Sequence, residues 1–217
     1  MLLIYYGYLL VFIKNMHYTA KKFNLPALTG ISDKQIEMHL ELYEGYVKHI
    51  NLLREQIHDL ETFDKEKYAY AVTETRRRLG FEFNGMRMHE LYFSQWEGAA
   101  TDPTKGNLFT QTLTEKYASW ESFVEHFKTV GMSRGIGWTI LYADPGEKTV
   151  HTAWVTDHEL GQLGNLPIIL AMDMWEHAYM VDYLPSEKKQ YIEAFFKNLN
   201  WSVVEKRFNR ISYGAPL

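Results

Sequence analysis

Two long segments in the first half of the chain have the apolar spacing of amphipathic helices, and they constrain the fold more than any other feature. Ser32, followed by Asp33 and Gln35, resembles a helix start, and apolar residues then recur every three to four positions. This pattern predicts one helix from about residue 33 to 60 and a second from about 68 to 96. Two such helices joined by a few residues predict a helical hairpin.

The second half of the chain alternates between helical and strand patterns. The predicted helices cover residues 119–129 and 186–208, and the predicted strands cover residues 138–143, 150–155 and 166–172. We therefore expect an α+β fold, in which an N-terminal long α-helical hairpin packs on a C-terminal α/β domain with a small three-stranded antiparallel sheet. Residues 99–106 have linker composition, so the expected domains are residues 16–98 and 107–217.

The amino end differs in composition from these domains. Residues 1–13 are almost wholly apolar and aromatic, but the run is shorter than the roughly 20 residues that span a bilayer. It has no basic segment before it and no evident small-residue cleavage site after it. Residues 1–15 are therefore interpreted as an apolar N-terminal extension, with Met16 as a candidate physiological start and an export signal or anchor as the alternative.

Composition excludes several kinds of function. The 217 residues are 46% hydrophobic and 23% charged, which indicates a globular protein. A net charge of -4 gives no general basic surface, so nucleic acid is not an expected partner. The chain contains no cysteine, which excludes disulfides, thiolate ligands and iron-sulfur clusters. A transition metal would therefore be held by nitrogen and oxygen atoms.

A candidate metal site begins where the third predicted strand ends. Asp173 follows the apolar run of residues 166–172, and His177 stands four residues later. A carboxylate and an imidazole supply half of a typical set of ligands, so further histidines are expected on other elements. His39 and His89 are candidates, because each lies among apolar residues of a predicted helix. Taken alone, such a histidine is more often a core residue than a ligand.

Several segments of the chain also occur in a characteristic order. They are residues 24–28, residues 36–39, the aromatic helix around His89, residues 135–139, the highly specific stretch from Asp173 to Tyr179, and residues 198–201. From about residue 23 to 208 this order resembles the iron/manganese superoxide dismutase family. The resemblance implies that His39, His89, Asp173 and His177 bind one iron or manganese ion per subunit.

The resemblance also implies a reaction, the conversion of superoxide to dioxygen and hydrogen peroxide. In the family the metal cycles between its trivalent and divalent states, and a bound solvent that alternates between hydroxide and water couples each electron to a proton. Hydrogen bonds to this solvent tune the reduction potential. Trp138 and Trp175 match the aromatic residues that enclose the site in the family.

The helix that carries His39 departs from the family's pattern. Many members have a histidine in the next turn and a gateway tyrosine eight residues after the ligand, whereas this chain has Tyr43 and Tyr46, at four and seven residues. A one-residue deletion, which removes a helix bulge, places Tyr46 at the gateway as a catalytic residue, and we favour this alignment. The ungapped alignment instead places Tyr43 at the histidine position and Val47 at the gateway.

A second departure lies beside His177. Met180 stands where the family usually has a tyrosine that bonds the missing histidine across the dimer interface, so both partners are absent together. This joint loss is consistent, because an unpaired buried hydroxyl costs about 1–3 kcal/mol. Glu176 matches the residue that in the family reaches a metal ligand of the partner subunit. A homodimer is therefore expected, and a tetramer stays open.

The choice of metal depends on a third departure. Iron-type members commonly have a glutamine four residues before the second histidine, but Gly85 occupies this position here, as in manganese-type members, which supply a glutamine from the other domain. The matching segment here contains His158, the expected hydrogen-bond partner of the bound solvent and a second catalytic residue, with Gln162 as the alternative. The sequence thus leaves iron, manganese or the use of either metal open.

The expected function is that of a cytoplasmic superoxide dismutase, with superoxide as its small-molecule substrate and no stable membrane association. One alternative keeps the metal without turnover, as a metal-stabilised interaction module of the same fold, because Tyr43 and Met180 replace residues near the site. A mononuclear iron oxygenase with two histidines and a carboxylate is a third reading. Such enzymes leave positions open for a co-substrate, whereas this chain offers a third histidine.

Overall fold

The computed structural model describes residues 17–212, which divide into two compact units. Residues 17–21 and 43–86 belong to the first unit, and residues 22–42 and 87–212 belong to the second. The predicted extension and the candidate start at Met16 lie outside the described residues. No helix in the described part of the chain is both long and apolar enough to cross a membrane. The domain boundaries expected near residue 100 stay a prediction.

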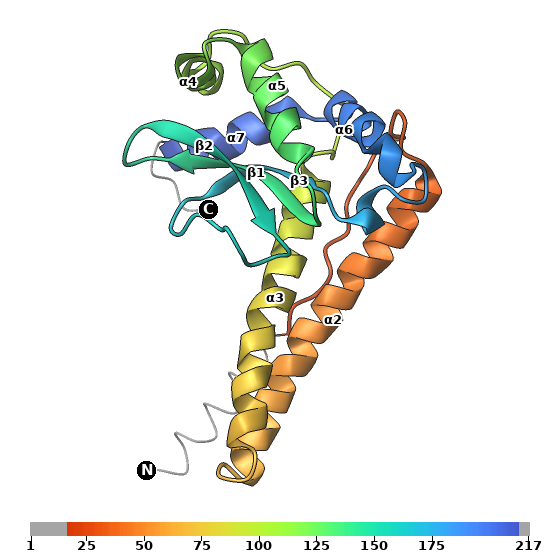
Figure 1. Cartoon of the computed structure of the whole chain (residues 1–217), viewed down its shortest axis with the longest axis vertical. Coiled ribbons are helices and arrows are strands. Elements are labelled where there is room, and N and C mark those ends of the chain that lie inside the picture. The colour runs from red at the N-terminus through yellow and green to blue at the C-terminus, as the bar shows by residue number, and fades with distance from the viewer. Residues whose placement is uncertain (1–16, 213–217) are drawn as a thin grey trace. The chain divides into compact units, whose positions relative to one another are not determined.

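The first unit contains an antiparallel pair of helices, which confirms the predicted helical hairpin. Its helices are parts of α2 (Asp33–Phe63) and α3 (Ala69–Ser94), which run in opposite directions from a short connection (Figure 1). The connection is closed by Asp64, because its side chain accepts a hydrogen bond from the Lys67 N–H at 3.0 Å and its carbonyl accepts one from the Tyr68 N–H at 3.1 Å. Such local bonds allow the chain to reverse within a few residues.

The second unit contains the predicted three-stranded antiparallel sheet. Its strands are β1 (Gly137–Asp144), β2 (Thr149–Thr156) and β3 (Ile168–Asp173), in the order β2-β1-β3. β3 begins two residues later than the apolar run predicts, because Pro167 has no N–H to donate to a neighbouring strand. Its carbonyl still accepts a hydrogen bond from the Ala143 N–H at 2.9 Å.

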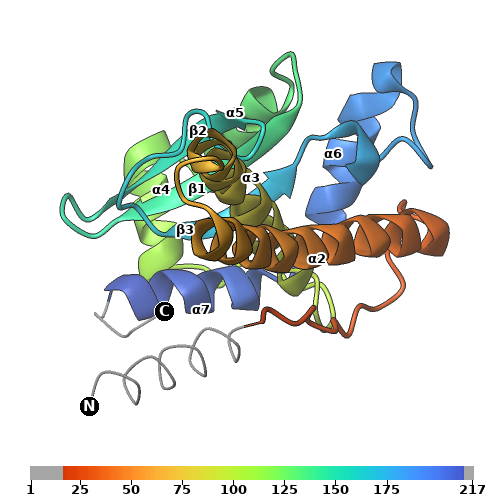
Figure 2. The same cartoon turned by 90° about the horizontal axis from the view of Figure 1, so that it is seen from below.

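Helices cover the sheet and complete the core of the second unit. They are α4 (Leu108–Tyr117), α5 (Trp120–Gly131), α6 (Lys188–Lys197) and α7 (Trp201–Ser212), with two 3-10 turns, η1 (Glu176–Ala178) and η2 (Pro185–Glu187). α4 and α5 pack on β1 and β2 (Figure 1), and α7 lies beside α4 and β3 (Figure 2). The predictions of α5 and of helices after residue 186 are confirmed.

The sequence interpretation did not include α4. Its start is nevertheless well defined, because the Asn107 side chain accepts a hydrogen bond from the Thr110 N–H at 2.8 Å, as a helix N-cap does. The helix contains three threonines, which have low helix propensity because branching at Cβ restricts the side chain. The hydroxyls of Thr112 and Thr114 donate to carbonyls one turn back, so tertiary packing and capping outweigh the weak propensity.

The outer edge of β3 is covered by two side chains from helices α6 and α7 and by one from the turn that follows α3. The carbonyls of alternate strand residues accept hydrogen bonds from Arg207 (to Ile169, 3.2 Å), Gln95 (to Ala171, 2.5 Å) and Tyr191 (to Asp173, 2.7 Å). Gln95 also accepts from the Ala171 N–H at 3.3 Å. Burial lowers the pKa of Arg207 only to about 10, so it stays a cation at neutral pH. β3 is therefore fixed from both sides, by β1 and by these three side chains.

Candidate metal centre

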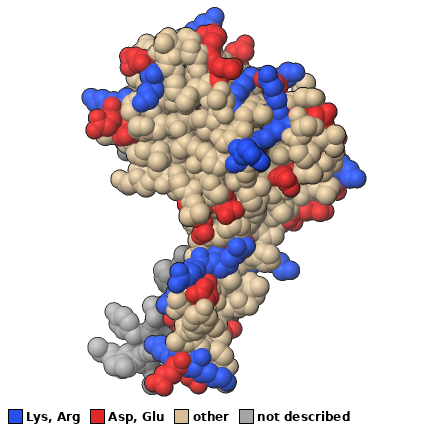
Figure 3. Space-filling model, viewed as in Figure 1, with Lys and Arg blue, Asp and Glu red and all other residues tan. Residues whose placement is uncertain are grey.

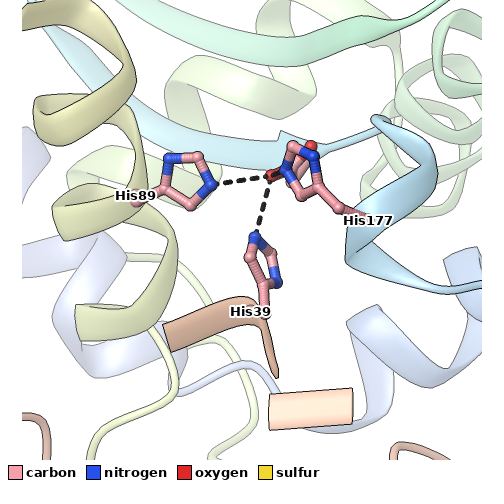
Figure 4. Close-up of side chains that lie close together, drawn as sticks. His39, His89 and His177 are labelled. Carbon is pink, nitrogen blue, oxygen red and sulfur yellow. Dashed lines mark hydrogen bonds and ion pairs between the residues drawn. The ribbon is translucent and has the colours of Figure 1, made fainter. Parts of the chain in front are cut away.

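The four predicted metal ligands come together within the second unit. His39 lies on α2, His89 on α3, Asp173 at the end of β3 and His177 in η1, and one ligand atom from each lies within 4.8 Å of the others. Asp173 Oδ2 is 3.1 Å from His39 Nε2, 3.1 Å from His177 Nε2 and 3.5 Å from His89 Nε2. Figure 4 shows the three imidazoles pointing toward a single carboxylate oxygen.

The local backbone explains how Asp173 and His177 reach the same point. Asp173 is the last residue of β3 and pairs with Trp138 of β1, so the sheet fixes its backbone. Its Oδ1 accepts a hydrogen bond from the Trp175 N–H at 2.9 Å, which turns the chain and leaves Oδ2 facing the histidines. His177 follows within one 3-10 turn. A strand end and a tight turn therefore place two of the four side chains.

The spacing of these atoms fits one metal ion. Donor atoms that share an ion at about 2.1 Å each lie roughly 3–3.6 Å apart, and the separations of 3.1 and 3.5 Å between Asp173 Oδ2 and the histidine nitrogens fall in this range. His39, His89 and Asp173 are buried, and His177 is partly exposed. Three imidazole nitrogens and one carboxylate oxygen suit iron or manganese, and the absence of sulfur disfavours softer metals.

The protonation states also suit metal binding. Burial lowers the pKa of His39, against the opposing effect of its hydrogen bond to Asp173, so the imidazole is neutral. Burial alone would raise the pKa of Asp173, but its interactions with His177 and His39 outweigh burial and hold this pKa well below its usual range. A neutral imidazole and an ionised carboxylate are the forms that coordinate a cation.

Comparison with known proteins assigns the chain to a family. Residues 104–207 match the C-terminal domain of iron/manganese superoxide dismutases. Over 188 residues the chain is 32% identical to the iron superoxide dismutase of Aquifex pyrophilus, and the match covers 84% of this chain and 86% of that protein. The chain belongs to the iron/manganese superoxide dismutase family. The resemblance found in the motifs of the sequence is thereby confirmed.

Other members of the family match over a similar length. The iron superoxide dismutase of Cupriavidus metallidurans is 31% identical over 185 residues, which cover 83% of this chain and 90% of that protein. The iron superoxide dismutase of Sulfolobus acidocaldarius is 29% identical over 183 residues, which cover 83% of this chain and 86% of that protein. The relationship therefore extends to both halves of the chain.

Within this family member, His158 borders the candidate centre. The Trp138 indole N–H donates to His158 Nδ1 at 3.0 Å, and because an indole nitrogen only donates, neutral His158 carries its proton on Nε2. The imidazole of His158 is fully buried, stacks on Trp175 with ring centroids 5.0 Å apart, and lies 6.1 Å from the ring of His89. It is thus placed to donate a hydrogen bond near the metal ligands.

The alternative, Gln162, is engaged elsewhere. Its Oε1 accepts a hydrogen bond from the Tyr142 hydroxyl at 3.2 Å, and its Nε2 donates to the His158 carbonyl at 3.1 Å. Both ends of the amide therefore support the loop that carries His158. This arrangement favours His158 over Gln162 as the partner of a bound solvent molecule, although the role itself stays a prediction.

Aromatic rings surround the metal ligands. Trp138 contacts His89 with ring centroids 5.2 Å apart, and Trp175 stacks on His177 at 5.6 Å, so both predicted tryptophans lie at the site. The sequence interpretation missed two further rings, those of Tyr92 and Phe93, which lie 5.1 and 4.9 Å from the ring of His39. Their positions three and four residues after His89 on a helix could have indicated this neighbourhood.

Four predicted residues, Tyr43, Tyr46, Val47 and Gly85, belong to the first unit. The Tyr43 hydroxyl accepts a hydrogen bond from the Lys21 N–H at 2.8 Å and so helps to hold residues 17–21 on the hairpin. The Tyr46 ring lies directly over Gly85, since a Cβ added at Gly85 would stand 2.5 Å from Tyr46 Cδ1. Val47 is buried. Neither the gateway role of Tyr46 nor that of Val47 is tested, and both stay predictions.

Three residues close to His177 in the sequence, Glu176, Met180 and Val181, are exposed. The Glu176 side chain is solvent-facing, and Met180, which replaces the family's usual tyrosine, is 46% exposed. Val181 is 39% exposed. An exposed carboxylate and apolar side chains next to a metal ligand are the features that contact with a second subunit would cover.

Proposed function

We propose that this chain is a superoxide dismutase that binds one iron or manganese ion per subunit. Two superoxide anions and two protons would give one dioxygen and one hydrogen peroxide. The observation that carries the proposal is the group of three buried residues, His39, His89 and Asp173, with the partly exposed His177. When bound there, the ion would supply the one-electron change by alternating between its trivalent and divalent states.

The residues of the chain support this chemistry in three ways. Three imidazoles, which bind a metal in their neutral form, and one carboxylate would offset little of the ion's charge, which suits a centre that gains and loses one electron. Because the Trp138 indole N–H donates to His158 Nδ1, the proton of the neutral imidazole is held on Nε2, and the same hydrogen bond fixes the orientation of the ring. The rings of Trp138 and Trp175 shield the ligands from bulk water, which strengthens each electrostatic interaction within.

We assign the described surface charges no role in attracting the anionic substrate over a long range. On the face shown in Figure 3, acidic and basic side chains are interspersed. The densest basic run, Arg76–Arg78, is paired with the nearby carboxylates of Glu61, Glu74 and Glu82. Neutralised pairs give little field beyond a Debye length of about 8 Å at physiological ionic strength. Recognition of superoxide is therefore proposed to depend on the centre itself.

Iron is the first metal to test, because three relatives that match over most of the chain are named iron superoxide dismutases. Manganese is the competing choice, because Gly85 replaces the glutamine of iron-type members. The hydrogen bond from Trp138 to His158 would serve a solvent bound to either metal.

A homodimer is proposed, on the basis of the exposed Glu176 beside His177 and the exposed Met180 and Val181. Sedimentation equilibrium would show a mass twice that of the 25.6 kDa chain. A monomer at micromolar concentration would remove this part of the proposal. The cytoplasmic location is proposed from the sequence alone and would be checked by cell fractionation.

The decisive experiment combines metal analysis with a superoxide-decay assay. Protein is expressed in iron-rich and in manganese-rich medium, the metal content of each sample is measured, and both are assayed. Activity should follow the bound metal, and His39→Ala should lose both metal and activity. His126→Ala, which changes a histidine far along the sequence from every ligand, is the control. Metal-loaded wild-type protein without activity would instead support the non-catalytic interaction module.

A further inference from the structure

Gln35 is a buried side chain that the proposed chemistry does not use. It lies in the first turn of α2, one helical turn before His39, and is only 1% exposed. Both ends of its amide bond the segment that carries His177. Gln35 Nε2 donates to the His177 carbonyl at 2.7 Å, and Gln35 Oε1 accepts from the Val181 N–H at 3.0 Å.

The amide occupies the place of a main-chain hydrogen bond. In a continuous helical turn, the Val181 N–H would donate to the carbonyl four residues back, which is that of His177. The neighbouring groups do so, since Met180 donates to Glu176 at 2.9 Å and Tyr183 donates to Tyr179 at 2.8 Å. Gln35 therefore inserts into this ladder, and such an insertion opens and bends a turn.

The insertion joins the backbones of two ligands that are 138 positions apart in the sequence. His39 is one turn along α2 from Gln35, and His177 is bonded to Gln35 directly through its carbonyl. Other contacts hold the same loop near the start of α2. Asp182 accepts from the Ser32 N–H at 2.7 Å, and the Tyr183 hydroxyl donates to the Gly30 carbonyl. Of these contacts, only that of Gln35 reaches His177.

We propose that Gln35 is a positioning residue for the metal centre, which fixes the His177 imidazole relative to His39 through the opened turn. This inference rests on the proposed metal-binding function. Without the amide, η1 can close its own hydrogen bond between residues 181 and 177, and the imidazole of His177 turns with it. A misplaced ligand weakens metal binding before it affects the fold, so metal affinity is the quantity that Gln35 controls.

Gln35→Leu removes both hydrogen bonds at similar side-chain volume. Gln35→Glu keeps an acceptor for Val181 and removes the donor to His177, so it serves as the second variant if Gln35→Leu does not fold. Asn198→Leu is the matched control, because the Asn198 amide also bonds a backbone N–H and carbonyl, those of Thr29, at 2.8 and 3.0 Å. Asn198 makes none of its described bonds to the loop after Asp173.

The measurement is the affinity of metal-free full-length protein for Mn²⁺, obtained by competition with a colorimetric chelator, beside the melting temperature of the metal-free form. Loss of a residue that orients a metal ligand weakens affinity about 10- to 100-fold. We expect this loss for both Gln35 variants, and less than about threefold for Asn198→Leu at a comparable fall in melting temperature.

The outcomes separate this inference from the proposed function. If wild-type protein binds no Mn²⁺ and no Fe²⁺, the metal site itself fails, and the inference with it. If wild-type protein binds the metal and the Gln35 variants bind it equally well, only the positioning role is overturned. If Asn198→Leu weakens binding as much as Gln35→Leu, the effect is general destabilisation, which also overturns the positioning role.

Discussion

The hydroxyl of Tyr191 has a fixed direction that can be tested by mutation. It donates to the Asp173 carbonyl at 2.7 Å and lies 3.0 Å from the Tyr92 hydroxyl. Since the only proton of Tyr191 goes to Asp173, Tyr92 must be the donor in the pair of tyrosines. Both are fully buried, and burial raises the pKa of each well above its usual value, so both stay protonated.

This direction of hydrogen bonding, from Tyr92 to Tyr191 to the Asp173 carbonyl, predicts that the two Phe variants lose unequal amounts of unfolding free energy. Tyr92→Phe removes one hydrogen bond and leaves no donor unpaired, so it should cost about 0.5–1.5 kcal/mol of unfolding free energy. Tyr191→Phe leaves the Tyr92 hydroxyl without an acceptor and leaves the Asp173 carbonyl without the hydrogen bond donated by Tyr191. Each such buried group costs about 1–3 kcal/mol, so the variant should lose about 2–6 kcal/mol before relaxation.

The double variant provides the sharpest result. In the Tyr191→Phe background the Tyr92 hydroxyl is already without a partner, so replacing it by Phe should restore about 1–3 kcal/mol. The effect of Tyr92→Phe therefore changes sign between the two backgrounds. Urea unfolding of the metal-free wild type, the two single variants and the double variant, all at the same protein concentration, measures the four unfolding free energies. Equal slopes of free energy against urea concentration would show that the variants unfold in the same way. Melting temperatures should shift by about 2–4 °C per kcal/mol.

Two results would contradict this reasoning. If Tyr92→Phe destabilises both backgrounds equally, the two hydroxyls are not coupled as described. If Tyr92→Phe costs more than Tyr191→Phe, the direction of the hydrogen bond is reversed.

Three further predictions concern glycines, alkaline stability and metal removal. Gly85→Ala should cost about 1–3 kcal/mol in urea unfolding, because its Cβ would stand 2.5 Å from the Tyr46 ring, whereas Gly45→Ala, with no atom within 4 Å of its Cβ, should be neutral or stabilising by up to about 1 kcal/mol. Burial raises the pKa of Tyr142 to about 12, so the folded state holds this proton while the unfolded state releases it near pH 10, and stability should fall as pH rises from about 10 to 12. Tyr142→Phe should show a smaller fall than wild type over that range, and an equal fall would argue against it. Removal of the metal by a chelator should lower the melting temperature. The difference should be larger when the metal-loaded sample contains more free metal relative to the Kd. An unchanged melting temperature would show that the metal does not bind the native state in preference to the unfolded state.

Periodic patterns explain why much of the fold could be predicted. The two long helices and the three strands each show their own spacing of apolar residues, and this spacing is a local property of the sequence. α4 was missed because its three threonines weaken the helical signal, although Asn107, a residue type favoured at helix starts, stands directly before it. Tertiary packing therefore stabilises α4 as a helix although its helix propensity is low.

The four candidate ligands could be proposed because Asp173 and His177 follow a predicted strand and His39 and His89 lie among apolar residues of predicted helices, and the family resemblance then joined them in one set. Gln35 and Tyr191 could not be found in this way. A glutamine in an amphipathic helix has the pattern of a solvent-facing residue, yet Gln35 bonds a carbonyl 142 positions away. Hydrogen bonds between distant segments leave no periodic trace, so the residues that support a site are harder to predict than its ligands.

The covered edge of β3 also limits how this protein can associate. Sheet proteins commonly aggregate when an edge strand pairs with a strand of another molecule through unpaired peptide groups. At Ile169, Ala171 and Asp173 these peptide groups already bond Arg207, Gln95 and Tyr191. A second chain would have to displace a buried guanidinium, amide and phenol before it could add a strand there. The same side chains that hold the metal-binding strand in place thus protect the protein against strand addition at β3.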